Sequence, residues 1–129
     1  MLMRIPVSIG EILDKKSILE IKSERISDEK KLINVRHELG VLDDELSKLE
    51  GLWESVGALY GQLKAVNEEL WVIEDEIRIK EAKKEFDAIF IDLARSVYVT
   101  NDKRADIKKE INLKMGSDLV EEKSYEDYQ

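Results

Sequence analysis

The chain has 129 residues and a formal net charge of −8 at pH 7, with 39% charged and 43% hydrophobic residues. This length fits a single domain, and the apolar fraction excludes an intrinsically disordered chain. The acidic balance argues against a protein that binds nucleic acid or anionic lipid, because both need a cationic surface.

Residue types that support zinc or disulfide chemistry are scarce. The chain has no cysteine, so disulfides are excluded and zinc sites lose their commonest ligand. The N-terminus lacks the apolar region of a secretory signal, and no apolar run approaches the roughly 20 residues of a membrane span. We therefore expect a cytoplasmic protein with no membrane partner, no metal and no cofactor.

The first helix has a clear start signal. Pro6 favours an extended lead-in over residues 3–7. Ser8 and Glu11 then have the spacing of a capping box, in which the serine accepts from a backbone N–H and the glutamate reaches back to the serine amide. A helix is predicted to begin at about residue 9.

A heptad pattern follows, made of two apolar series offset by three residues. One series contains Leu32, Leu39, Leu46, Trp53 and Tyr60, and the other contains Val35, Leu42, Leu49, Val56, Leu63, Leu70 and Ile77. Such a pattern is typical of coiled-coil packing. It predicts core positions for the seam residues, including Trp53, and a core position for Trp71 beside Leu70.

The glycines place a turn within this heptad region. Gly51, Gly57 and Gly61 cluster within eleven residues, and each glycine costs about 1 kcal/mol inside a helix. The pattern predicts a long antiparallel hairpin with arms at about 9–50 and 58–85 and a turn at about 51–57. The alternative is a continuous rod, because the heptad runs through the glycines without a break.

Two short helices are expected after the hairpin, at about 87–98 and 102–114. The β-prone residues 97–100 end the first, and Thr100 or Asn101 can cap the second. Gly116 occupies a C-cap position, and residues 116–129 form an acidic tail. The predicted fold is all-α, in one domain. A homodimer that pairs hairpins into a bundle is expected, because the first helix offers more apolar surface than one partner arm can cover, namely Ile12, Ile18, Leu19, Ile21 and Ile26.

One stretch of the chain carries a candidate binding site. Basic and polar residues recur at helical spacing, namely Arg95, Tyr98, Asn101, Arg104 and Lys108. A helix starting near residue 101 would favour an anion at its N-terminus, and the arginines could bind carboxylate or phosphate. The alternative is a structural one, in which Arg95 and Arg104 pair with hairpin acids such as Glu74 and Asp75.

Catalytic sets are otherwise absent from the sequence. The single histidine, His37, follows Val35 by two residues and should face solvent. Glu74 and Asp75 are candidates for a general base, although Glu74 can also form an i,i+4 ion pair with Arg78.

The run from Ile12 to Arg25 resembles the first helix of helical chorismate mutases. That resemblance would make Arg25 a carboxylate-binding arginine. The chain departs from the family pattern at Ser8, where an arginine is expected, and at Arg36, where a lysine is expected. The family's second-helix acid and C-terminal glutamine have no clear counterpart, so the resemblance does not extend to an activity.

A second resemblance covers nearly the whole chain. Ile5-Pro-Val-Ser-Ile-Gly-Glu11, Asn67-Glu-Glu-Leu-Trp71, Leu93-Ala-Arg-Ser-Val-Tyr98 and Glu121-Glu-Lys-Ser-Tyr125 are similar to strings in a family of uncharacterised bacterial proteins, a domain of unknown function. The resemblance implies that residues 121–125 are ordered, and it brings no activity with it.

Two functions therefore remain open from the sequence. The first is a non-enzymatic helical interaction or scaffold protein, favoured by the long seam and the lack of a catalytic set. The alternative is a binder of, or an enzyme acting on, a small anionic metabolite, with its site in residues 95–108. They differ in whether Arg95 and Arg104 converge with free donors or are occupied by acids of the hairpin.

Overall fold

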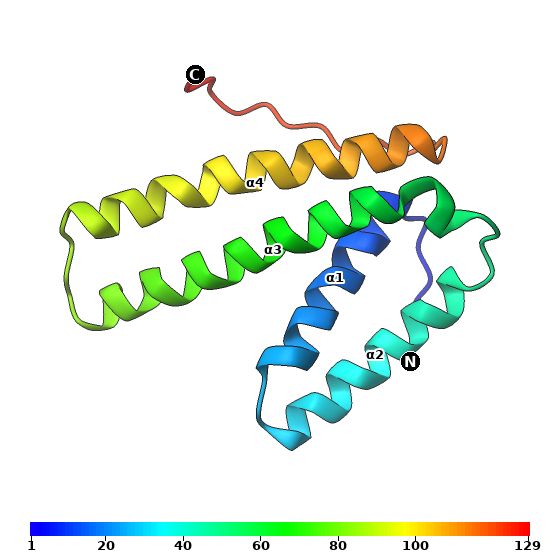
Figure 1. Cartoon of the computed structure of the whole chain (residues 1–129), viewed down its shortest axis with the longest axis horizontal. Coiled ribbons are helices and arrows are strands. Elements are labelled where there is room, and N and C mark those ends of the chain that lie inside the picture. Colours follow the sequence, from blue (N-terminus) through cyan, green and yellow to red (C-terminus); the bar gives the residue numbers. More distant parts are fainter.

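A computed structural model describes all 129 residues as four α-helices and no strands, which confirms the all-α prediction (Figure 1). The helices are α1 (Ile9–Arg25), α2 (Glu29–Leu46), α3 (Leu52–Ala82) and α4 (Ala88–Lys114). α1 and α2 form a short antiparallel hairpin. α3 and α4 form a longer one, and its distal half extends past the short hairpin. None of the helices is both long and apolar enough to cross a bilayer.

The predicted first arm, 9–50, is two helices rather than one. Ile26 is extended, and Asp28 caps α2 by accepting a hydrogen bond from the backbone N–H of Lys30 at 2.9 Å. The aspartate gives the chain an alternative to a continuous helix at this position, because its side chain replaces the missing backbone acceptors. The chain reverses here, and α2 folds back along α1.

The predicted turn at 51–57 and second arm at 58–85 are shifted. The chain turns at residues 47–51, and α3 begins at Leu52 and runs to Ala82. Of these three glycines, Gly51 alone adopts a left-handed conformation, with φ of 71°, whereas Gly57 and Gly61 lie inside α3. The packing of a 31-residue helix outweighs the modest cost of two interior glycines.

The two short helices predicted at 87–98 and 102–114 are one continuous helix, α4. Asp87 caps it by accepting from the backbone N–H of Phe90, and Gly116, with φ of 63°, follows its end as predicted. The β-prone segment 97–100 stays helical because α4 packs along α3 and buries Thr100. Tertiary packing here exceeds propensity differences of less than about 1 kcal/mol per residue.

The core lies where the two hairpins meet. Leu13 of α1, Leu46 of α2 and Ile111 of α4 pack around the N-terminal half of α3, which contributes Leu52, Val56, Leu59 and Leu63. Six of the predicted seam residues are buried, namely Leu32, Val35, Leu46, Val56, Leu63 and Leu70. Leu49 is exposed and Trp71 is only half-buried, so neither is a core residue as predicted. Trp53 is also wrong as a core residue. It is 43% exposed and packs edge-on against Tyr60, with ring centroids 5.3 Å apart.

The acidic tail lies back along α4 without regular secondary structure (Figure 1). Glu121 pairs with Lys108 at 3.1 Å, and the ring of Tyr128 contacts Tyr98 at a centroid distance of 5.0 Å. Tyr125 remains largely exposed. The tail is therefore held by a few polar and aromatic contacts rather than by buried apolar side chains.

Candidate functional site

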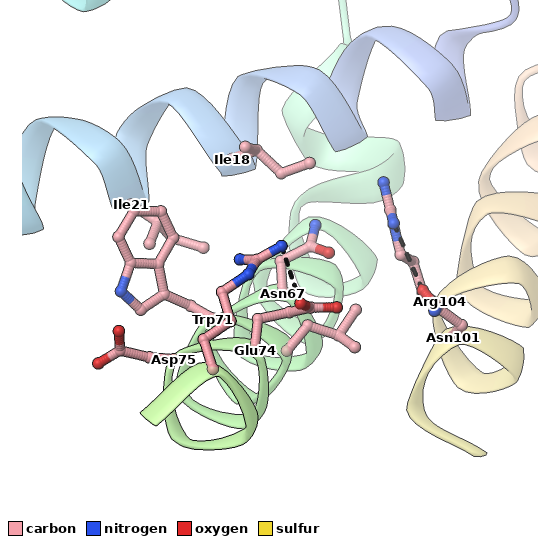
Figure 2. A pocket seen from close by; sticks show the side chains of 10 residues that line it. Ile18, Ile21, Asn67, Trp71, Glu74, Asp75, Asn101 and Arg104 are labelled. Carbon is pink, nitrogen blue, oxygen red and sulfur yellow. Dashed lines mark hydrogen bonds and ion pairs between the residues drawn. The ribbon is translucent and has the colours of Figure 1, made fainter. Parts of the chain in front are cut away.

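A groove of about 410 Å³ opens where α1 diverges from the long hairpin. α1 contributes Ile18 and Ile21, α4 contributes Asn101 and Arg104, and α3 contributes Asn67, Leu70, Trp71, Glu74, Asp75 and Arg78 (Figure 2). Three helices thus supply an apolar floor with polar groups around it. This volume is in the range of small-molecule sites.

The inner end of the groove is built on a buried ion pair. Arg104 donates through Nε to Asp14 Oδ1 at 2.9 Å, and its terminal nitrogen donates to Asp14 Oδ2, so the contact is bidentate. The Asp14 side chain is only 3% exposed and that of Arg104 is 29% exposed. The hydrogen bonds from Arg104 to Asp14 raise the pKa of the guanidinium above its usual value, so it stays charged.

Two further side chains complete the hydrogen bonding of Asp14. Asn67 Nδ2 donates to Asp14 Oδ1 at 2.9 Å and lies 2.7 Å from Ser17 Oγ, and the Ser17 hydroxyl donates to the Asp14 carbonyl oxygen. Asp14, Ser17 and Asn67 are all buried. We call these residues, with Arg104, the Asp14 network. It ties α1 to both helices of the long hairpin.

Lys108 lies one turn further along α4 and is also paired. Its Nζ is 2.8 Å from Glu11 Oε2 and 3.1 Å from Glu121 Oε2. Burial alone would lower the pKa of Lys108, but the hydrogen bonds to these carboxylates outweigh it and raise the pKa. Ser8 caps α1 as predicted, accepting from the Glu11 N–H at 3.1 Å. The predicted return contact from the Glu11 carboxylate to the Ser8 amide does not form, because that carboxylate pairs with Lys108.

The five predicted binding residues do not form one cluster. Arg95 and Arg104 are nine residues apart, or about two and a half helical turns, so they lie on opposite faces of α4. Arg95 is exposed, and Tyr98 contacts the tail instead of the groove. Asn101 and Arg104 do line the groove, together with Glu74 and Asp75.

The outer part of the groove is more exposed. Glu74 and Arg78 form an i,i+4 ion pair at 3.4 Å whose side chains are 42% and 77% exposed. Asp75 lies on the same side of the pocket as Trp71, and Asn101 and Arg104 lie on the opposite side (Figure 2). Asp75 has no ion-pair partner among the protein's cations, so a free carboxylate remains at this edge.

The sequence patterns did not single out Asp14, Ser17 or Asn67, although a signal for Asn67 exists. Asn67 follows Tyr60 by seven residues and so continues the first heptad series. A polar residue on an apolar seam indicates a buried hydrogen bond. Asp14 and Ser17 are three residues apart and share a helix face, but nothing local predicts that Arg104, 90 residues away, reaches them.

Other candidates lie outside this site. His37 is exposed, as predicted, and Arg25 is exposed at the end of α1, away from the groove. No group of three or more His, Asp or Glu side chains is placed to hold a metal ion. Because Arg25 lies away from the groove, the structure shows no binding site that would match the resemblance to chorismate mutases.

Comparison with known protein families identifies the family of this chain. The family of unknown function DUF6165 matches residues 3–128, and the chain belongs to this family. No curated protein and no solved structure matches the chain. The full-length resemblance read from the sequence is thus confirmed as a family relationship, and the function has to be argued from the geometry.

Proposed function

We propose that the protein is a non-enzymatic helical interaction protein that self-associates as a homodimer. The observation that carries this proposal is the apolar surface at the distal end of the α3/α4 hairpin. Four residues there, each at least 48% exposed, are Ile79, Phe86, Ile89 and Ile91. We call these four residues the hairpin tip.

A two-helix hairpin cannot cover this surface by itself. α1 packs against the other end of α3, α2 packs mainly against α1, and neither reaches residues 79–91 (Figure 1). Leu19 and Ile21 of α1, expected at the dimer surface, are instead buried within the chain. Isolated helical hairpins gain most of their stability from packing of apolar faces, and a third or fourth helix is needed to close the core. Two copies related by a two-fold axis would supply these helices to each other as a four-helix bundle.

The occupied state of Arg104 also supports an interaction protein over a binder of an anionic metabolite. Its donors point at Asp14, and Lys108 is held by Glu11 and Glu121. An anion would have to displace these carboxylates. The anionic-metabolite alternative keeps two supporting observations. Asn101 and Arg104 line one groove with Glu74 and Asp75, and Asn101, Arg104 and Lys108 line a second cavity of about 250 Å³.

Sedimentation equilibrium of the purified protein tests the proposal. The chain has a mass of 15.0 kDa, and we expect twice this mass at micromolar concentration. The double variant Ile79→Lys/Ile89→Lys should raise the dimer dissociation constant by about tenfold or more, since each buried apolar residue contributes about 1.5 kcal/mol or more.

Leu113→Lys is the matched control, because Leu113 is 71% exposed at the other end of α4. It should leave the dissociation constant unchanged. A monomeric mass for the unmodified protein at these concentrations would contradict the homodimer, and an equal effect of the control would contradict the assignment to the hairpin tip.

A further inference from the structure

The groove has unfilled hydrogen-bond acceptors, and the two arginines in its lining already face oxygens of the protein. Arg104 donates to Asp14 and Asn101, and Arg78 faces Glu74. The lining groups without a hydrogen-bond partner on the protein include the Asp75 carboxylate and Asn67 Oδ1, beside the N–H donors of Trp71 and Asn101. The unpaired carboxylate favours a ligand that brings N–H donors and positive charge.

Asn67 supplies the acceptor that is best fixed in place. Its Nδ2 must face Asp14, because a carboxylate only accepts hydrogen bonds, and this sets the orientation of the amide. Oδ1 then receives no hydrogen bond from the protein. Every buried side-chain oxygen of the protein has a hydrogen-bond partner. Asn67 Oδ1 has none, so it must be accessible to solvent, and it is reached from the groove that Asn67 lines. The residue itself is 95% buried, with an exposed fraction of 5%.

The outer wall adds charge and an aromatic face. Asp75 has no cationic partner, and Glu74 is shared only with the exposed Arg78. The Trp71 ring lies between Ile21 and Asp75 (Figure 2), and Ile18 and Leu70 add apolar surface to the lining of the groove. An indole attracts a cation over its face, and an apolar floor accommodates an alkyl stem.

The surrounding potential favours the same sign of ligand. Between Glu38 and Glu76 there are eleven acidic residues and two lysines, and α3 contributes much of this acidic stretch. The groove is lined by two acids, Glu74 and Asp75, and by two arginines, of which Arg104 is neutralised by the buried Asp14. The negative charge left over raises the local concentration of cations. Arg78 shows that a guanidinium fits at Glu74, since it occupies that position within the protein.

We propose that this groove binds a small organic cation, an alkyl chain that carries an ammonium or guanidinium group. The cationic head would lie between Glu74, Asp75 and the Trp71 ring and donate inward to Asn67 Oδ1. The alkyl stem would lie on Ile18, Ile21 and Leu70. The proposal is independent of the homodimer, because the groove is formed within one chain and does not include the hairpin tip.

Titration with agmatine tests the site, since this molecule carries a guanidinium and an ammonium on a four-carbon chain. The protein would carry Trp53→Phe, so that Trp71 is the only tryptophan and its fluorescence reports the groove. We expect saturable binding of one agmatine per chain by calorimetry, with a change in Trp71 emission at the same midpoint. Succinate at the same ionic strength should give neither.

Charge variants locate the binding within the groove. Glu74→Gln/Asp75→Asn should weaken agmatine binding by about tenfold or more, because the charge pairs are partly desolvated. Glu69→Gln/Glu76→Gln is the matched control on α3, since it removes the same charge from exposed residues that do not line the groove. Its effect should stay within about twofold, as expected for screened charges.

Arg78 gives a test in the opposite direction. Arg78→Gln removes the internal competitor at Glu74 and should tighten agmatine binding several-fold, whereas Arg95→Gln, on the other side of α4, should not. Equal losses in the two acid variants, or no change in Trp71 emission, would overturn the site in favour of diffuse counterion binding. Binding of succinate in place of agmatine would overturn the cation assignment in favour of an anion site.

Discussion

Two polar networks connect α1 to its neighbours, and they differ in their access to water. The Asp14 network is centred on a buried carboxylate that is 3% exposed, and no buried side-chain polar atom lacks a partner. The second network surrounds Glu20 and includes Lys16, Lys64 and Tyr60, with pair distances of 2.9 and 3.1 Å to the two lysines. Its members keep contact with solvent, and we call it the Glu20 network.

The comparison teaches that similar ion pairs can have different structural consequences. A buried charge left without its partner costs several kcal/mol, so the Asp14 network fixes how α1 sits on α3 and α4. A partly exposed pair can exchange its partner for water, so the Glu20 network contributes little that is specific to one arrangement. The groove depends on the Asp14 network, because Asn67 and Arg104 are members of that network and also line the groove.

The largest expected effect comes from removing the central carboxylate. Asp14→Ala leaves the Arg104 guanidinium without its partner and Asn67 without its main acceptor, and it should lower the free energy of unfolding by about 3–5 kcal/mol. Urea denaturation followed by circular dichroism measures this loss. Glu74→Ala, an exposed carboxylate paired with Arg78, should stay within about 0.5 kcal/mol. Similar losses for both variants would remove the distinction based on burial.

A second, smaller effect tests the close approach of α1 to α4. At Gly10 an added Cβ would lie 2.7 Å from the Lys108 carbonyl oxygen and 2.8 Å from Asn112 Oδ1, and the Gly10 N–H donates to that same oxygen at 2.7 Å. Gly10→Ala should therefore destabilise the protein by about 1–3 kcal/mol.

Gly57→Ala is its control, because no atom lies within 4 Å of the added Cβ and Gly57 is inside α3. It should stabilise the protein by about 0.5–1 kcal/mol. Thermal and urea unfolding of both variants would show opposite signs. A neutral or stabilising Gly10→Ala would mean that α1 and α4 do not approach as closely as described.

The smallest effect is a pH dependence in the Glu20 network. Burial alone would raise the pKa of Glu20, but hydrogen bonds from Lys16, Tyr60 and Lys64 outweigh it and lower the pKa below its ordinary value of 4.5. Burial and the hydrogen bond to Glu20 in turn raise the pKa of Tyr60, which keeps its hydroxyl protonated as a donor.

A lowered carboxyl pKa contributes stability that is present above pH 4.5 and is lost as the pH falls through the folded-state value. The urea midpoints of the unmodified protein and Glu20→Gln should therefore differ near neutral pH and converge in acid. A difference that stays constant from about pH 7 to about pH 3 would contradict the coupling of Glu20 to these partners.

The sequence predicted some features because their causes are local. The Ser8 cap and the Gly116 end signal depend on a few adjacent residues, and both are present. The break between α1 and α2 was not predicted, although the Asp28 cap that begins α2 is also local. Asn67 continues the first heptad series seven residues after Tyr60, and its polarity on an apolar seam is a local signal for the buried contact that was not used in the prediction.

Composition and periodicity by themselves determined that this protein is all-α, because apolar spacing at helical period and scarce proline leave few other folds. They also determined its acidic surface. Only the tertiary structure decided that α3 and α4, rather than one long first arm, make the long hairpin, and that Arg104 meets Asp14 while Arg95 points away. The Arg104–Asp14 contact joins residues 90 positions apart. It depends on how whole helices pack, which no local pattern specifies.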